Sequence, residues 1–345
     1  MTLQVNVVMG GPSVENEVSL KSGREVISNL DRNKYKVRAV VVSKNKMFFF
    51  TDITDKIPSV EDILAPEKSE CFTGPFSPAN SVSVWDGCDA AFLALHGEFG
   101  EDGVIQGYLE TLGIPYTGSG VYGSAVAMNK ITSKYLYLQS GLDVPPYTVF
   151  GKRFPEVTPD SILKRHGFPC FIKCPQSGSS RLMGKAENRE ELCTILNDLC
   201  KHSDEILIES TISGPEFTCG VMELPDGTLK AFPPVEIRPV KSSFFDFTAK
   251  YSDGASEEIV PAPWPEDLLK RIQSTALAAH HILECSGVSR TDMIYQHDKL
   301  HVLETNTLPG LTPNSLLPKA FKAAGGTYSE MLDMLIQSTL KKGRN

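Results

Sequence analysis

The sequence of 345 residues contains no apolar run that approaches the ~18–20 residues of a membrane-spanning helix. Its first residues, MTLQVNVVMGG, form a strand-like pattern and lack the charged start of a secretory signal. No basic block or stripe occurs, and 42 acidic residues against 34 lysines and arginines give a net charge of −8. We therefore expect a protein with no membrane partner and no nucleic-acid partner.

Cysteine pairs of the kind that bind metals or form redox motifs are also absent. The eight cysteines stand singly, no CxxC occurs, and Cys170 and Cys174 form the closest pair. We expect reduced, structural thiols in a cytoplasmic protein. The glycine turn after the first predicted strand, MGGPSVENEVSL, lacks GxGxxG, which argues against a dinucleotide oxidoreductase. The chain also lacks GxxxxGKS/T, which argues against a Walker-type phosphate loop.

Hydrophobic residues make up 41% of the chain, enough for a large core and more than one domain. The first 118 residues predict alternating apolar strands and helices, at 3–11, 17–30, 35–43, 88–97 and 104–111. Asp102 is the expected N-cap of the last of these helices, and Gly113 ends it. Nearly continuous apolar strands between helices indicate an α/β domain with a parallel sheet covered on both faces.

The remainder of the chain predicts two further regions. The central one, 119–213, reads as α/β, with a helix at 123–140, a strand at 167–175, a flexible loop at 176–185, a helix at 190–202 and a strand at 205–210. The C-terminal one, 214–345, reads as α+β. Its pattern changes to antiparallel from about 214, where a hairpin from 217 to 237 is expected, followed by a mobile loop at 240–258 and helices at 266–284 and 327–341.

A second hairpin, RTDMIYQHDKLHVLETNTLPG, combines apolar strands with polar residues at one end. If residue 298 is the centre of a three-residue turn, Asp292 lies opposite Glu304 and Arg290 lies opposite Asn306. Strand side chains alternate between faces, so all four project from the same face. Facing carboxylates repel each other unless a cation lies between them.

These oxygen donors favour Mg²⁺ or Mn²⁺ over Zn²⁺. The spacing alone leaves three possibilities open: a metal site, a pair of solvated acids, or a carboxylate paired to Arg290.

Other candidate residues are weaker when each is taken alone. Lys173 ends the apolar strand CFIK, where a charge must face a cleft or lose hydration, and the following QSGSS could cradle phosphates. Glu15 precedes the first helix, and His96 follows a predicted parallel strand at the sheet edge where ligands bind. Lys130 lies on a predicted helix. Each of these residues could also be an ordinary surface or structural side chain.

Taken together and in order, several segments resemble the D-alanine–D-alanine ligases of the ATP-grasp superfamily. The resemblance covers essentially the whole chain. The matching segments are GGPSVENEVSLKSG, ALHGEFGEDGVIQGYLETLGIPYTGSG, MNKITSK, FIKCPQSGSS, ILIESTISGPEFT, FFDFTAKY, RTD and ETNTLPGLTPNSL. It implies an ATP-grasp fold with an N-terminal Rossmann-like, substrate-binding domain at 1–118, a central subdomain at 119–213, and a C-terminal subdomain at 214–345 with the metal site.

The implied activity is ATP-dependent ligation of two D-alanines to D-alanyl-D-alanine for peptidoglycan precursor synthesis. The reaction passes through an acyl phosphate and yields ADP and phosphate. The resemblance also implies two Mg²⁺ or Mn²⁺ ions and a homodimer. Ligases that use D-lactate or D-serine as second substrate, and a non-catalytic ATP-binding relative, are the alternatives. Lactate-using relatives often carry histidine at the position of Tyr251, so this tyrosine favours the dipeptide.

The resemblance also implies a role for individual residues in nucleotide binding. Lys130 and Lys173 would bind the phosphates of ATP. Ser179 and Ser180 would lie in a loop that closes over these phosphates. Adenine would meet the backbone around Glu209 and Ile212, the ribose would meet Glu216, and the transferred phosphoryl group would meet Lys250. The metal ligands would be Asp292, Glu304 and Asn306, with Glu304 bridging both ions and Asn306 also near the nucleotide.

For the amino-acid substrates, Glu15 would bind the ammonium of the first D-alanine and connect to Ser179 and Tyr251. His96 would lie beside the carboxylate of this substrate. The second D-alanine carboxylate would be bound by Ser315 and the Leu316 backbone, and the oxyanion hole would be formed by Arg290 and the Gly310 N–H.

One departure concerns the phosphate loop: where the family usually has Val-Gly, this chain has Arg181-Leu182. The loss of a glycine would limit the available φ values, and we expect it to affect loop closure and ATP affinity.

Overall fold

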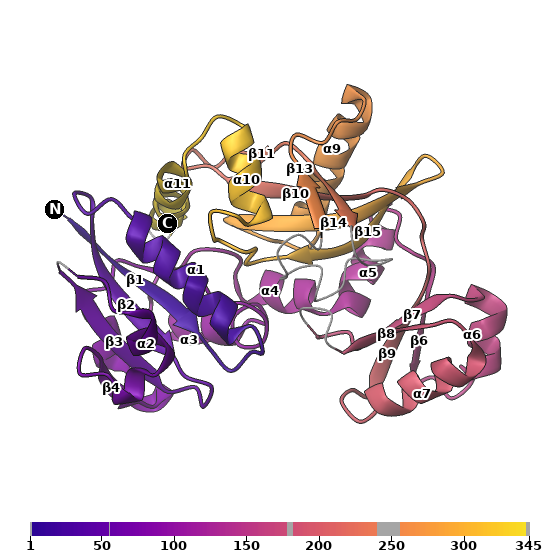
Figure 1. The fold of residues 1–345 in the computed structure, drawn as a ribbon, viewed down its shortest axis with the longest axis horizontal. Helices are drawn as coiled ribbons and strands as arrows, with labels where there is room; N and C mark the ends of the chain where they lie inside the picture. The colour runs from indigo at the N-terminus through magenta and orange to yellow at the C-terminus, as the bar shows by residue number, and fades with distance from the viewer. Residues whose placement is uncertain (1, 55, 178–181, 240–255, 343–345) are drawn as a thin grey trace.

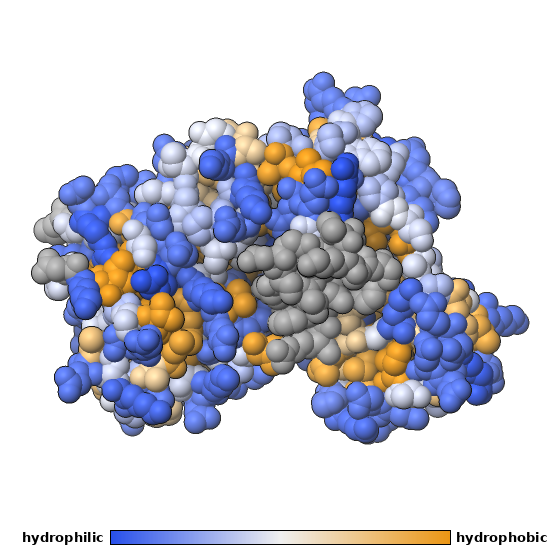
Figure 2. Space-filling model, viewed as in Figure 1, coloured by the Kyte–Doolittle hydropathy of each residue, from blue (hydrophilic) through white to orange (hydrophobic). Residues whose placement is uncertain are grey.

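The computed structural model describes residues 2–54, 56–177, 182–239 and 256–342. Figure 1 shows three sheet-containing parts, with the N-terminal and central parts lying on either side of the C-terminal sheet. The predicted mixed α/β class is confirmed. No helix among these residues is both long enough and apolar enough to cross a membrane. On the face in Figure 2, hydrophilic side chains dominate the described surface, and hydrophobic ones gather in small groups.

The N-terminal part is built on a five-stranded sheet in the order β4-β3-β2-β1-β5. Its strands are β1 (Leu3–Gly10), β2 (Tyr35–Val42), β3 (Phe48–Ile53), β4 (Thr73–Phe76) and β5 (Ala90–Leu93). Its α-helices are α1 (Asn16–Asn29), α2 (Val60–Leu64) and α3 (Val104–Thr111). Short 3-10 helices occupy Pro66–Lys68, Pro78–Asn80 and Val82–Trp85.

The central strands of this sheet are buried on both faces. Val5, Val7 and Met9 of β1 pack into one core with α1, whereas Val8 packs into a second core on the other face. The predicted parallel pairing is confirmed, because β1 pairs in parallel with both β2 and β5. The sequence missed two antiparallel strands, β3 and the edge strand β4. The predicted N-cap was one residue early: Gly103 caps α3, and Asp102 accepts a hydrogen bond from the Val104 N–H at 3.1 Å.

The predicted single helix at 123–140 is two helices, α4 (Val121–Met128) and α5 (Lys130–Gln139). Asn129 separates them, because its side-chain oxygen accepts hydrogen bonds from the N–H groups of Ile131 and Thr132 at 3.1 Å each. A capping asparagine starts a new helix and satisfies its free N–H groups. Lys130 therefore occupies the first position of α5.

The central sheet has the order β6-β9-β7-β8, and all its pairs are antiparallel. Its elements are β6 (Tyr147–Gly151), α6 (Pro159–His166), β7 (Cys170–Lys173), β8 (Met183–Ala186), α7 (Arg189–Leu199) and β9 (Glu205–Ser210). The expectation that antiparallel pairing begins only near 214 was wrong. The predicted loop at 176–185 was also too long, because Met183 already lies in β8, and residues 178–181 are outside the described ranges.

The C-terminal sheet has the order β13-β12-β10-β14-β15, and β11 also pairs with β10. Its strands are β10 (Glu216–Glu223), β11 (Leu229–Ala231), β12 (Val235–Pro239), β13 (Ser256–Ile259), β14 (Val288–Gln296) and β15 (Lys299–Asn306). Its helices are α9 (Glu266–Ile282), α10 (Leu316–Ala323) and α11 (Tyr328–Lys342). The end of the predicted mobile loop, 256–258, lies in β13, and the rest of that loop up to 255 is outside the described ranges.

The β14–β15 hairpin has the predicted pairing at its polar end, although its turn differs from the predicted one. Asp292 pairs with Glu304, and Arg290 pairs with Asn306. The turn contains two residues, His297 and Asp298, with φ of 47° and 60°, as in a type I′ turn. Compared with the predicted three-residue turn, a two-residue turn shifts every strand pair by one residue. The register then shifts back by one residue between Asp292 and Met293. This β-bulge restores the facing acids.

A shared core joins the N-terminal and C-terminal parts. The core beside β1 and α1 also contains Met222 of β10, Leu317 of α10 and Met331 of α11. In Figure 1, α11 lies next to the N-terminal sheet although it is last in the chain. This packing fixes the N-terminal sheet against the C-terminal one.

The close approach of α1 to β1 gives a stability prediction. A Cβ on Gly23 would lie 2.6 Å from the Met9 Cβ, so Gly23→Ala should lower the free energy of unfolding by about 1–3 kcal/mol. The control is Gly107→Ala in α3, whose Cβ would meet only Val121 at 3.7 Å. It should raise stability by about 0.5–1 kcal/mol, because alanine favours helices. Urea unfolding followed by circular dichroism measures both, and equal effects would contradict the packing.

Candidate active site

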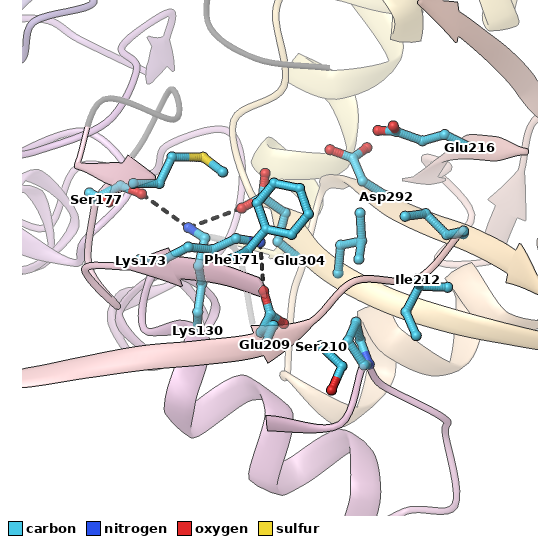
Figure 3. Close-up of a pocket in the computed structure, with 14 residues that line it drawn as sticks. Lys130, Phe171, Lys173, Ser177, Glu209, Ser210, Ile212, Glu216, Asp292 and Glu304 are labelled. Atoms are coloured by element: carbon cyan, nitrogen blue, oxygen red, sulfur yellow. Dashed lines mark hydrogen bonds and ion pairs between the residues drawn. The ribbon is translucent and has the colours of Figure 1, made fainter. Parts of the chain in front are cut away.

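A pocket lies between the central and C-terminal sheets, with α5 at its base (Figure 3). It encloses about 880 Å³ including its open mouth, a size suited to a small ligand. Alternation along the strands explains the lining. In β7, Cys170 and Ile172 pack into the core with α6 and α7, whereas Phe171 and Lys173 face the pocket. The pocket is lined by Lys130, Pro145, Phe171, Lys173, Ser177, Met183, Glu209, Ser210, Ile212, Glu216, Asp292, Ile294, Leu303 and Glu304.

Glu209 is the centre of a buried charge cluster on the central sheet. Its two carboxylate oxygens lie 2.6 Å from the Lys134 Nζ and 2.6 Å from the Lys173 Nζ. Burial alone would raise the pKa of Glu209, but the two ammonium groups lower it to about 2. Burial would likewise lower the pKa of Lys173, but Glu209 raises it. Burial lowers the pKa of Lys134, although Glu209 opposes this shift. With both lysines protonated, the cluster carries one excess positive charge beside the pocket.

Lys130 bridges the two sheets on the other side of the pocket. Its Nζ lies 2.9 Å from the Glu304 Oε2 and donates a hydrogen bond to the Ser177 carbonyl at 3.0 Å. Figure 3 shows these contacts, with the Lys130 side chain reaching up from α5 to lie between Ser177 and Glu304. A phosphate group here would meet two ammonium groups and the backbone of the segment that leads into the predicted phosphate loop.

The facing acids of the hairpin are paired with protein cations. Arg290 donates to both Asp292 oxygens, from Nε at 3.0 Å and from Nη2 at 2.9 Å. Asp292 also accepts hydrogen bonds from Thr218 at 2.5 Å and from the Asn306 amide at 3.2 Å. The carboxylate paired to Arg290, one of the three possibilities left by the spacing, is therefore present.

The same hairpin residues suit a hard cation. Two carboxylates and an amide supply only oxygen donors once the Asn306 amide is turned, and Mg²⁺ takes one or two carboxylates together with substrate phosphates. Within the described ranges, no three His, Cys, Asp or Glu side chains form a metal cluster. A cation at Asp292, Glu304 and Asn306 would therefore complete its shell with water and with oxygen atoms of a bound phosphate.

Glu15 and His96 lie together at the edge of the N-terminal sheet. Both are buried, and the charge of Glu15 acts on the His96 ring. The His96 Nδ1 lies 3.1 Å from the Leu308 carbonyl oxygen, and Nε2 lies 3.1 Å from the Ser22 hydroxyl. Because a carbonyl only accepts, this network assigns the proton to Nδ1. Burial lowers the pKa of His96, which favours a neutral ring.

Gly310 and Ser315 lie together after β15. A Cβ on Gly310 would lie 2.8 Å from the Ser315 Oγ, so a larger residue here would displace the serine hydroxyl. Ser315 precedes α10, whose first residue is Leu316, and its hydroxyl is 2.9 Å from that of Thr312. The charge of Arg290 acts on His96 and Glu101, which places its guanidinium between the hairpin acids and the N-terminal residues.

The structure thus brings together most of the residues singled out in the sequence. Seven line the pocket or flank it: Lys130, Lys173, Glu209, Ile212, Glu216, Asp292 and Glu304. Asn306 and Arg290 adjoin Asp292. The predicted residues Ser179, Ser180, Lys250 and Tyr251 lie outside the described residues.

Two residues of this region were missed by the sequence reasoning. Lys134 is fully buried and pairs with Glu209, and its Nζ also donates to the Leu303 carbonyl at 3.3 Å. Its position, one helical turn after Lys130 in MNKITSK, was the available signal. Glu101, in the GEDG segment, bridges two loops through its carboxylate.

Comparisons with known proteins give the family. The chain matches the D-ala D-ala ligase N-terminus over residues 4–119 and the D-ala D-ala ligase C-terminus over residues 136–337. A D-alanine--D-alanine ligase from Leptospira biflexa is 38% identical over 348 residues, covering 98% of this chain and 99% of the relative. The enzyme of that name from Syntrophobacter fumaroxidans is 40% identical over 340 residues, covering 98% of each.

Solved structures agree. The D-Ala:D-Ser ligase from Enterococcus faecalis superposes with a TM-score of 0.85 at 32% identity, covering 98% of this chain and 100% of that one. The D-alanine--D-alanine ligase from Bacillus anthracis complexed with ATP gives a TM-score of 0.77 at 31% identity, covering 99% of each chain. These matches extend over both sheets of the pocket and over the N-terminal sheet. The chain belongs to the D-alanine–D-alanine ligase family.

Proposed function

We propose that this protein joins two D-alanines to D-alanyl-D-alanine at the expense of ATP, for peptidoglycan precursor synthesis. The observation that carries the proposal is the pocket between two sheets, where Lys130 and Lys173 lie across from the hairpin acids. The full-length match to ligases of this name supports it. A second candidate is ligation of D-alanine to D-serine, favoured by the similarity to the D-Ala:D-Ser ligase structure.

In this proposal the two lysines bind the phosphates of ATP. The excess positive charge around Glu209 attracts the polyphosphate into a partly dry pocket. Adenine contacts the backbone near Glu209 and Ile212, and Glu216 binds the ribose. Ser179, Ser180 and Lys250 belong to the proposed nucleotide site, in segments outside the described residues.

Asp292, Glu304 and Asn306 would hold two Mg²⁺ or Mn²⁺ ions, with Glu304 shared between them. These ions would neutralise charge on the phosphoryl oxygens during transfer. The oxygen-only donor set fits such ions. Lys130 and Arg290, which now neutralise the two acids, would then turn toward the phosphates and the reacting carboxylate.

The amino-acid half uses the N-terminal residues and the turn after β15. Glu15, linked to Ser179 and Tyr251, binds the ammonium of the first D-alanine, and His96 lies near its carboxylate. ATP converts this carboxylate to an acyl phosphate, which the amine of the second D-alanine attacks. Ser315 and the Leu316 N–H bind the second carboxylate, and Arg290 with the Gly310 N–H stabilises the oxyanion. Such a donor typically contributes about 10²–10³ in rate.

The remaining proposals concern organisation. We propose three units at 1–118, 119–213 and 214–345, and a cytoplasmic homodimer. Exposed apolar side chains on the neighbouring helices α3 and α4, at Val104, Val121 and Tyr122, support a protein contact on this side of the N-terminal part.

An assay of ADP formation and phosphate release tests the proposed function. We expect turnover that requires both Mg²⁺ and D-alanine, because the pocket and the amino-acid residues act in one reaction. D-serine and D-lactate are offered together with D-alanine as competing second substrates, and product mass identifies the dipeptide or depsipeptide.

L-alanine is the control substrate. A rate with L-alanine equal to the D-alanine rate would contradict the assignment. ATP binding without turnover on any of these substrates would favour the non-catalytic relative instead.

The Glu304→Gln variant tests the role of the facing acids. An amide provides less charge for cations and for Lys130, so kcat should fall by about a hundredfold or more, while the unfolding temperature changes little. Steady-state kinetics and thermal unfolding measure the two effects. The matched control is Asp298→Asn at the exposed turn of the same hairpin, where asparagine tolerates the positive φ. Activity of Glu304→Gln at saturating Mg²⁺ equal to wild type would remove this role.

A further inference from the structure

Leu308 connects the turn after β15 to the N-terminal part through its side chain and both of its backbone polar groups. Its side chain is only 4% exposed and packs into the core with Leu95 and Phe99. Its N–H donates to the Glu101 Oε1 at 3.0 Å, and its carbonyl accepts from the His96 Nδ1 at 3.1 Å. A Cβ on Gly118 would lie 2.8 Å from the Leu308 Cδ2, so Leu308 is enclosed tightly.

The second carboxylate oxygen of Glu101 binds the turn at Gly97, in the N-terminal part. Its Oε2 accepts a hydrogen bond from the Gly97 N–H at 2.8 Å. Gly97 borders Glu15, because a Cβ on Gly97 would lie 2.9 Å from the Glu15 Oε2 and 2.5 Å from the Ser13 Oγ. One carboxylate therefore holds both the turn beside Glu15 and the backbone of Leu308.

The two turns carry different parts of the amino-acid site. Leu308 lies two residues before Gly310, which in turn lies against Ser315. The distance between the first-substrate residues and the second-substrate residues thus depends on how the two turns are held together. In the amino-acid half of the proposed reaction, the amine of one substrate must approach the activated carboxyl of the other closely.

We propose that Glu101 is a positioning residue that sets the spacing between the two D-amino-acid subsites by bridging the Gly97 turn and Leu308. This inference rests on the proposed function. It adds Glu101 to the amino-acid site as a residue that acts through the Gly97 turn and the turn at Leu308. Glu101 touches neither substrate in this scheme. Its contribution is geometric, and it should affect amino-acid binding without affecting the nucleotide pocket, whose lining comes from other elements.

The Glu101→Gln substitution tests the bridge with a side chain of nearly the same size and shape. Burial, with a contribution from Glu15, raises the pKa of Glu101 to about 7, while the two N–H donors and Arg290 oppose the shift. A carboxyl group in either protonation state offers two oxygens to the two N–H donors, whereas an amide offers one. The variant therefore removes one end of the bridge.

We expect Glu101→Gln to raise the KM for D-alanine about tenfold or more, because misplacement of about 1 Å is costly. The KM for ATP should stay within about twofold. The matched control is Glu98→Gln in the same loop, where the side chain is exposed and lies 3.6 Å from Lys46. It should resemble wild type in both values. A fall in kcat or thermal stability with an unchanged KM for D-alanine would overturn the proposal, as would an equal rise in both KM values.

Amide hydrogen exchange separates this inference from the proposed function. Peptides covering 306–311 should exchange faster in Glu101→Gln than in wild type or Glu98→Gln, whether or not the chain ligates D-alanine. Unchanged exchange would overturn the bridge. Absence of wild-type turnover, with the exchange difference present, would overturn the ligase function and leave the bridge in place. If Glu101→Gln fails to fold, Leu308→Val is the second variant, because it loosens the packing of the residue at the other end of the bridge. It should give the same rise in the KM for D-alanine and the same faster exchange of 306–311. Wild-type values for both measurements would overturn the inference.

Discussion

The site depends on opposite charges that are paired before any ligand binds. Two sheets line the pocket, with Lys173 and Glu209 on the central sheet and Asp292 and Glu304 on the C-terminal sheet. Charges in a partly dry pocket are costly unless they are paired. Lys134, Lys130 and Arg290 supply the partners.

Paired charges of this kind suit a ligand that carries both signs. An anionic polyphosphate can take the place of carboxylates beside the lysines, and a divalent cation can take the place of ammonium and guanidinium groups beside the acids. A metal–nucleotide complex does both at once, so no charge is left unpaired when it binds. The low pKa of Glu209 has the same origin, since its carboxylate lies between two ammonium groups.

The fold links this pocket to the amino-acid residues by short connections. The β14–β15 hairpin carries Arg290 and Asp292 on one strand and Glu304 and Asn306 on the other. The chain leaving β15 reaches Leu308, which is bound to the N-terminal part, and then Gly310 and Ser315. The residues proposed to bind the metal ions and phosphates are therefore only a few positions away, in one continuous segment, from those proposed to bind the second amino acid.

Local patterns in the sequence were sufficient for the elements and for part of the site. Nearly continuous apolar runs indicated the parallel strands β1, β2 and β5, and period-two alternation indicated the shared face of the hairpin residues. Both signals are properties of neighbouring residues. The resemblance in motifs supplied the family, which the full-length matches confirm. The prediction of a single helix at 123–140 was wrong because one capping residue, Asn129, ends the helical pattern and starts a new helix.

By itself, then, the sequence determined which residue types could bind phosphate and hard cations, and which of them share a strand face. The tertiary structure alone decided their partners. Lys134 pairs with Glu209 only because α5 packs beneath β9, and Glu101 reaches Leu308 across 207 residues of chain. The facing acids owe their register to a two-residue turn offset by a bulge, two deviations that cancel. Such contacts arise from packing between distant segments, which no local pattern encodes.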